Sequence, residues 1–101
     1  MSKNNLEFFI KLFDDKHIIF QGSFAYIDTK LDECDFQNFL CEFESYIYQI
    51  IPHLELKINF YSIYEEEYGG SCHYGVLGIN IDNLSKKDMR YIKEEIYALF
   101  I

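Results

Sequence analysis

Hydrophobic and polar residues alternate over two stretches near the N-terminus. In residues 6–13 the apolar residues Leu6, Phe8, Ile10 and Leu12 recur at every second position, and the same period runs through residues 18–26. A period of two is typical of β-strands. Residues 14–16, Asp-Asp-Lys, form a polar turn between the two stretches. The pattern therefore predicts an antiparallel hairpin over residues 6–26.

The hydrophobic period then changes to three and four residues, which is the spacing of one helix face. Asp32 precedes this region as a predicted N-cap, and Pro52 ends it because proline cannot continue the helical hydrogen bonds. The sequence predicts an amphipathic helix from about Cys34 to Pro52, with an apolar stripe of Phe36, Phe39, Leu40, Phe43, Ile47, Ile50 and Ile51.

The second half of the chain repeats this order of elements. Alternation predicts one strand over residues 54–60 and another over residues 73–81, with Gly69 and Gly70 suited to the loop of a hairpin. Ser85 to Asp88 resembles a capping box, with aspartate in place of the usual glutamate or glutamine. Apolar residues at helical spacing follow, so a second helix is predicted almost to residue 101.

These elements predict a single α+β domain over residues 1–101, in the order ββαββα. Two hairpins, each followed by a helix, pack most simply as one antiparallel four-stranded sheet with both helices on one face. The other face of the sheet is then left open.

The composition indicates a hydrophobic core and an acidic surface. The chain has 101 residues, of which 50% are hydrophobic and 19% are aromatic, all phenylalanine or tyrosine, which excludes a disordered chain. Its net charge is −8. Such a surface repels phosphate, so we expect no direct binding to nucleic acid or to an anionic membrane, and cationic proteins are the natural partners. The alternative is that the acidity serves solubility alone.

The number and spacing of the cysteines bear on the redox state of the compartment in which the protein is expected. Cys34, Cys41 and Cys72 are an odd set without CxxC spacing, and no signal-peptide pattern opens the chain. A reducing cytoplasm is therefore expected. Cys34 and Cys41 lie seven residues apart beside the phenylalanine stripe, which predicts that both are buried core thiols. No apolar run approaches the length of a membrane span.

The negative charge is concentrated in two regions, the first long helix with the residues before it and the segment "YEEEYGG". Six acids lie between Asp28 and Tyr46, against Lys30 alone. Carboxylates interleaved with tyrosines can pair with lysine and arginine and also stack on them. The predicted partner-binding residues are Glu42, Glu44, Tyr46, Tyr64, Glu65, Glu66, Glu67 and Tyr68. The alternative is a solvated helix face and a polar loop.

The sequence contains no pattern typical of a catalytic or metal-binding site, so we predict that the protein is not an enzyme and binds no cofactor. Three consecutive glutamates in extended chain cannot all reach one metal ion, and no second pair of cysteine or histidine residues stands nearby. Cys72 and His73 are adjacent on a predicted strand and so point to opposite faces, which leaves the thiol without a base. His17 and His53 are predicted surface residues near turns, with no acidic partner close in the sequence.

The chain resembles the small acidic α+β immunity proteins of bacterial polymorphic and contact-dependent growth inhibition toxin systems. The segments that carry the resemblance are "IIFQGSFAYID", "DECDFQNFLCEFESYIY" and "YEEEYGG". The resemblance implies a cytoplasmic antidote that binds one toxin domain, in our interpretation a basic nuclease domain.

Two alternatives remain open at the level of sequence. One is a phage anti-defence protein, such as an anti-CRISPR, that occupies a nucleic-acid groove. The other is a homo-oligomeric module that pairs through its open sheet face or an edge strand. Phe9, Phe13 and Ile19 are then the exposed apolar residues, whereas under a two-sided fold they are core residues.

Overall fold

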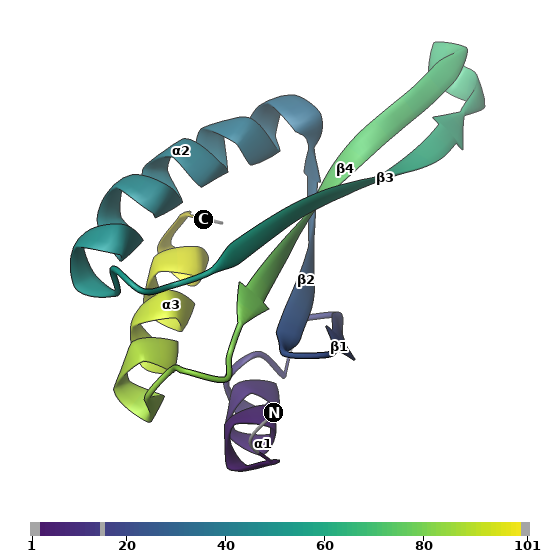
Figure 1. The fold of residues 1–101 in the computed structure, drawn as a ribbon. Coiled ribbons are helices and arrows are strands. Elements are labelled where there is room, and N and C mark those ends of the chain that lie inside the picture. The colour runs from purple at the N-terminus through teal and green to yellow at the C-terminus, as the bar shows by residue number, and fades with distance from the viewer. Residues whose placement is uncertain (1–2, 15, 100–101) are drawn as a thin grey trace.

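The computed structural model describes residues 3–14 and 16–99. It is an α+β fold with three helices and a curled antiparallel sheet of four strands (Figure 1). The elements in chain order are α1 (Lys3–Leu12), β1 (Ile18–Gln21), β2 (Phe24–Asp32), α2 (Glu33–Ile50), β3 (Leu56–Glu65), the 3-10 turn η1 (Glu66–Tyr68), β4 (Gly70–Asn80) and α3 (Lys86–Leu99). The strand order in the sheet is β1-β2-β4-β3, and all neighbouring strands are antiparallel.

The α+β class and the four antiparallel strands are as predicted, but the N-terminal strand is wrong. Residues 3–12 form α1, so the order ββαββα is not confirmed and the chain has a third helix. Leu6, Phe9, Ile10 and Phe13 also recur at helical spacing, so this short apolar run fits both periods. Phe9 and Phe13 are buried and stack at 4.5 Å. They are core residues, and the expectation that they are exposed at an oligomer interface is wrong.

The predicted strand over residues 18–26 is in fact a tight hairpin. Gly22 has a φ of 61°, a backbone conformation that glycine adopts without strain, and Gln21 pairs with Phe24 across a two-residue loop. The first hairpin is therefore β1 with β2, and α1 precedes it. Asp15, part of the predicted polar turn, lies outside the described residues.

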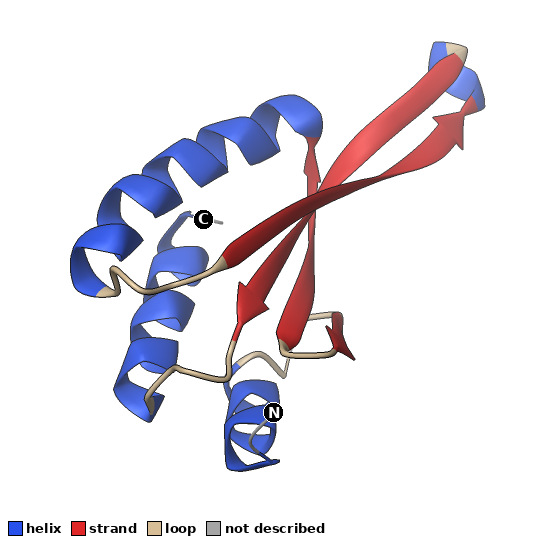
Figure 2. Cartoon of the chain, in the orientation of Figure 1, coloured by secondary structure: helices blue, strands red, loops and turns tan. Residues whose placement is uncertain are grey.

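The second hairpin is longer than predicted and projects from the body. β3 runs to Glu65, into the segment predicted as a loop, and the turn at its end is a single 3-10 turn closed by Gly69 with a φ of 65°. The hairpin extends past the helices, and the molecule measures 45 × 26 × 21 Å (Figure 2). The carboxylates at its tip are held well away from α1.

One core joins the three helices to the sheet. Alternate residues of β2 and β4, among them Ile27 and Leu77, are buried against the stripe of α2 that the sequence predicts. The two helix predictions are confirmed with their caps. The Asp35 N–H donates to Asp32 Oδ1 at 2.9 Å at the start of α2, and Ser85 and Asp88 exchange hydrogen bonds at the start of α3.

Candidate partner-binding surface

A hollow of about 420 Å³ lies where the start of α2 meets the projecting hairpin. We call it the acidic hollow. Its lining residues come from the end of β2, the first turn of α2 and both strands of the hairpin: Lys30, Leu31, Asp32, Asp35, Glu65, Cys72 and Tyr74. Three of the seven are carboxylates, and one is a lysine.

A bulge in β2 positions the helix side of this hollow. The register between β2 and β4 shifts between Asp28 and Asp32, and Lys30 within the shift has a φ of 56°. Thr29 stabilises the bulge because its hydroxyl donates to the Gly75 carbonyl at 2.7 Å and accepts the Leu31 N–H at 3.3 Å. The bulge leaves Asp32 paired opposite Tyr74, where it caps α2 and opens the hollow.

Hydrogen-bonded tyrosines form the strand side. The Tyr74 hydroxyl donates to Glu65 Oε1 at 2.9 Å, and this bond, with burial and the carboxylate charge, raises the pKa of Tyr74 to about 12. Tyr61 stacks on Tyr74 at 5.6 Å, and its hydroxyl donates to Asp28 at 2.9 Å. Burial, then the hydrogen bond to Asp28, raise the pKa of Tyr61. Both rings are therefore neutral donors held in place at physiological pH.

The environment of Cys72 disfavours its thiolate form. Burial, followed by the charge of Glu65, raises the pKa of the Cys72 thiol, which disfavours the thiolate. The neighbouring His73 forms a 2.7 Å hydrogen bond with Ser62, so it is engaged elsewhere.

A second hollow of about 250 Å³ continues the first along α2. Leu31 and Asp35 line both, and the second also contains Asn38, Phe39, Glu42 and Leu99. We call the two together the acidic groove. Asp32, Asp35, Glu42 and Glu65 carry its negative charge, and within residues 3–14 and 16–99 no lysine or arginine forms an ion pair with any of these four.

The structure brings some of the predicted binding residues together and separates others. Glu42 lies seven residues after Asp35 and Tyr46 lies four residues after Glu42, so the three share one ridge of α2, and Tyr46 is 57% exposed. Glu44 lies two residues from Glu42, about 200° round the helix, and so on the opposite flank. Burial, and after it the charge of Glu44, raise the pKa of Tyr48, which lies on the same side of α2 as Glu44.

The remaining predicted residues lie at the hairpin. Glu65 lines the groove, whereas Glu66 and Glu67 are exposed in the turn beyond it. Tyr64 is 65% exposed near the end of β3. The side chain of Tyr68 lies outside the described residues. Asp32, which the sequence predicts as an N-cap, and Asp35 are not among the predicted binding residues, although both belong to the six acids counted between Asp28 and Tyr46.

The cations of the chain lie mostly against its own aromatic rings. Lys57 is 4.2 Å from the Phe24 ring centroid, and Lys86 and Arg90 lie over Phe8 at 5.4 and 5.2 Å. These rings belong to β2 and α1, away from the groove. Lys30 pairs with Asp28 at 3.6 Å and is 76% exposed. Lys30 lines the hollow but pairs with Asp28, and the other cations named here lie away from the groove, so its carboxylates remain available to another molecule.

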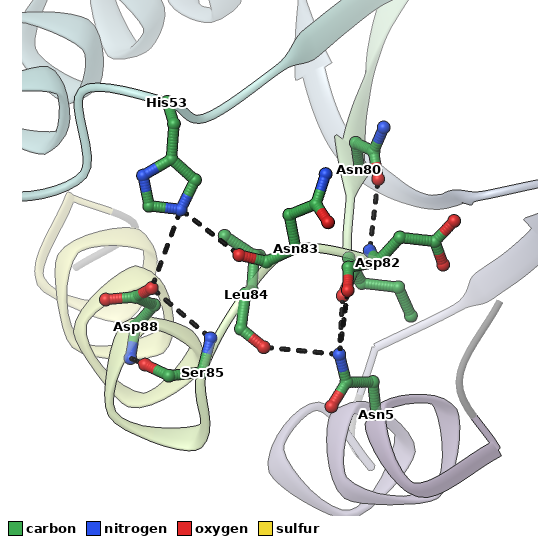
Figure 3. Close-up of polar contacts among 9 residues, drawn as sticks. Asn5, His53, Asn80, Asp82, Asn83, Leu84, Ser85 and Asp88 are labelled. Carbon is green, nitrogen blue, oxygen red and sulfur yellow. Dashed lines mark hydrogen bonds and ion pairs between the residues drawn. The ribbon is translucent and has the colours of Figure 1, made fainter.

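A separate polar cluster lies at the start of α3 (Figure 3). His53 Nε2 is 3.1 Å from the Asn83 carbonyl oxygen and 3.9 Å from Asp88, an acid that lies far from His53 in the sequence and that the fold brings close. Ser85, His53 and Asp88 are residue types found in catalytic triads. Here the Ser85 hydroxyl accepts the Asp88 N–H at 3.0 Å as a helix cap, so the cluster has a structural role.

The prediction of buried thiols on α2 is wrong, because Cys34 and Cys41 are both exposed. Each lies two residues, about 200° of rotation, from a buried phenylalanine of the stripe. Among the described residues, no group of three or more histidine, cysteine or carboxylate side chains could hold a metal ion. In the same part of the chain, no helix is long and apolar enough to span a membrane.

No protein-family model matches this chain, and neither a curated protein nor a solved structure matches it. The acidic groove is therefore the feature of this chain from which a function can be inferred.

Proposed function

We propose that this protein is a non-enzymatic inhibitor that binds a cationic protein through the acidic groove, and that it is an immunity protein that neutralises a toxin with a basic nuclease domain. The observation that carries the proposal is the set of four carboxylates that line one groove without a cationic partner in the described chain.

The electrostatics of the groove support a cationic ligand. The N-terminus of α2 contributes a partial positive charge of about 0.5, but Asp32, Glu33 and Asp35 bring three full negative charges to the same turn. The carboxylates therefore outweigh the helix dipole by several fold. An arginine or lysine of a partner can pair with them, whereas a phosphate is repelled.

The tyrosines favour a protein surface over a free cation. Tyr74 lines the groove, Tyr61 stacks on Tyr74, and both are held by hydrogen bonds, while Tyr46 on α2 and Tyr64 on β3 are exposed. Tyrosine gives a large contact area at a small cost in side-chain entropy, and its face stacks on guanidinium groups. A nuclease domain offers such cations because it must bind phosphate.

The test is binding to the toxin domain encoded by the adjacent reading frame. We expect the two proteins to co-purify, and the triple variant Asp35→Asn, Glu42→Gln, Glu65→Gln to bind roughly ten- to one-hundredfold more weakly, at about 0.5–1 kcal/mol per exposed ion pair. The matched control Glu7→Gln, Asp14→Asn, Glu94→Gln removes the same charge from outside the groove and should bind as the wild type does.

Two results would contradict the proposal. Equal losses in the two triple variants would mean that net charge acts without a defined site. Full protection of cells from the toxin by the groove variant, with unchanged affinity, would place the interface elsewhere. A salt titration adds a check, since the wild-type affinity should fall with ionic strength more steeply than that of the groove variant.

A further inference from the structure

β3 forms one edge of the sheet and has no strand on its outer side. It has ten residues, and its register with β4 is unbroken from Leu56 opposite Ile79 to Glu65 opposite Gly70. The strand at the other edge, β1, has four residues. Short edge strands resist pairing with other chains, whereas a long regular edge is a template for it. The two edges of this sheet therefore differ in their capacity to bind another strand.

The alternation of hydrogen-bonded and non-bonded pairs between β3 and β4 shows which backbone groups of β3 point to the open edge of the sheet. The Asn80 N–H donates to the Glu55 carbonyl at 3.0 Å, and this pair continues the register of β3 with β4. Bonded and non-bonded pairs alternate along an antiparallel ladder. Odd-numbered residues of β3 therefore bond to β4, and the even-numbered ones direct N–H and C=O to the open edge. These are Leu56, Ile58, Phe60, Ser62 and Tyr64.

The described structure shows none of the usual devices that block pairing along this edge. β3 contains no proline, glycine or bulge. Phe60, Ile63 and Tyr64 are 41%, 47% and 65% exposed, which leaves large apolar side chains on the edge strand. Charged residues lie at its two ends, and its middle from Ile58 to Tyr64 is uncharged. An edge of this kind pairs readily with a complementary strand.

We propose that β3 pairs with β3 of a second copy of this chain, antiparallel about a two-fold axis, so that two sheets join into one of eight strands. The charge pattern of β3 selects this partner. Its first charged residue is Lys57, and Glu65 to Glu67 stand at its end. Antiparallel pairing brings the Lys57 end of each copy beside the acidic end of the other, whereas parallel pairing would stack the acids. Lys57 is exposed and can reach across, although it also lies over the Phe24 ring.

Ser62 provides a specific test because its N–H points to the open edge. Ser62→Pro removes one edge donor and adds a ring at the new interface, and it keeps every hydrogen bond between β3 and β4. The matched control Ser62→Ala keeps the N–H and loses the same 2.7 Å bond to His73. Molar mass is measured by light scattering during size exclusion, with reductant present because Cys34 and Cys41 are exposed.

We expect the wild type and Ser62→Ala to be dimers at micromolar concentration. Ser62→Pro should be a monomer with native circular dichroism, or a dimer weakened by at least about tenfold. In amide exchange followed by NMR, Phe60, Ser62 and Tyr64 should become protected as concentration rises, while the odd-numbered Tyr61 and Ile63 are protected at every concentration.

Three outcomes would overturn the proposal. The first is a wild type that stays monomeric at hundreds of micromolar. The second is a dimer that Ser62→Pro leaves intact. The third is a dimer that Ile19→Lys dissociates, because Ile19 lies on β1, 57% exposed, and lines a hollow on the outer sheet face together with Tyr26 and Val76. Ser62→Pro and Ile19→Lys change no residue of the acidic groove, so the dimer can fail while the groove still binds toxin. Glu65 belongs to both surfaces, so Glu65→Gln is not used to test the dimer.

Discussion

Phe36 of α2 lies directly against Gly75 of β4, and substitution of Gly75 by alanine should destabilise the fold. A Cβ at Gly75 would lie 2.1, 2.2 and 2.5 Å from three ring carbons of Phe36. Phe36 is fully buried and has Phe39 and Phe60 as ring neighbours at 6.0 and 5.5 Å. The ring has little room to withdraw, so α2 must move away from β4. Glycine is required at this position because there is no room for a Cβ atom, and not because φ is positive.

The size of the effect follows from two opposed contributions. The new methyl group requires the ring to retreat by more than 1 Å to reach an ordinary contact, and overpacking of this kind costs about 1–3 kcal/mol. Alanine in a strand recovers about 0.5–1 kcal/mol of backbone entropy relative to glycine. We therefore expect Gly75→Ala to lower the free energy of unfolding by about 1–2 kcal/mol, and Tm by roughly 4–16 °C in a domain of this size.

A double-mutant cycle with Phe36→Leu, measured by urea denaturation, isolates the clash. Phe36→Leu alone should cost about 1–2 kcal/mol through lost packing. Because leucine lacks the ring that the methyl group meets, Gly75→Ala should cost little or nothing in the Phe36→Leu background. Additive free energies in the double variant, within about 0.5 kcal/mol, would refute the steric explanation.

The same variant reports on the groove. Phe36 follows Asp35 in the first turn of α2, and Gly75 follows Tyr74 in β4. A displacement of α2 from β4 therefore separates Asp35 from Tyr74 and Glu65 across the acidic hollow. Under the proposed function, folded Gly75→Ala should bind its partner more weakly at a temperature where it is fully native.

Two further predictions concern hydrogen bonds that the structure defines. Tyr74, with a folded pKa of about 12 against 10 when unfolded, should stabilise the fold fully below pH 10 and lose this contribution as pH rises from 10 towards 12. The ultraviolet phenolate difference between wild type and Tyr74→Phe should titrate near 12, and Glu65→Gln should lower that pKa; an unchanged value would mean that Glu65 is not the cause. Ser85→Ala should lower the free energy of unfolding in urea by about 1 kcal/mol, because the Asp88 N–H loses its cap acceptor, whereas Ser71→Ala, at an exposed position on β4, should have little effect.

The sequence alone determined the elements whose signals are local. The stripe of α2, its cap at Asp32, the capping box at Ser85 and the left-handed glycine at Gly69 all depend on residues a few positions apart, so they can be predicted without knowledge of the fold. The excess of carboxylates over lysine and arginine is likewise fixed by the chain, and it is the feature on which the proposed function first rested.

Tertiary structure decided what depends on contacts distant in sequence. Residues 6–13 fit two periods, and the packing of Phe13 against Tyr97 and of Phe9 against Phe20 accompanies the helix. The acidic groove needs the bulge at Lys30 and the long hairpin to bring Glu65 close to residues thirty or more positions earlier. Pairing in a sheet and packing of a helix join residues by position in space, and no local pattern of residues contains that information.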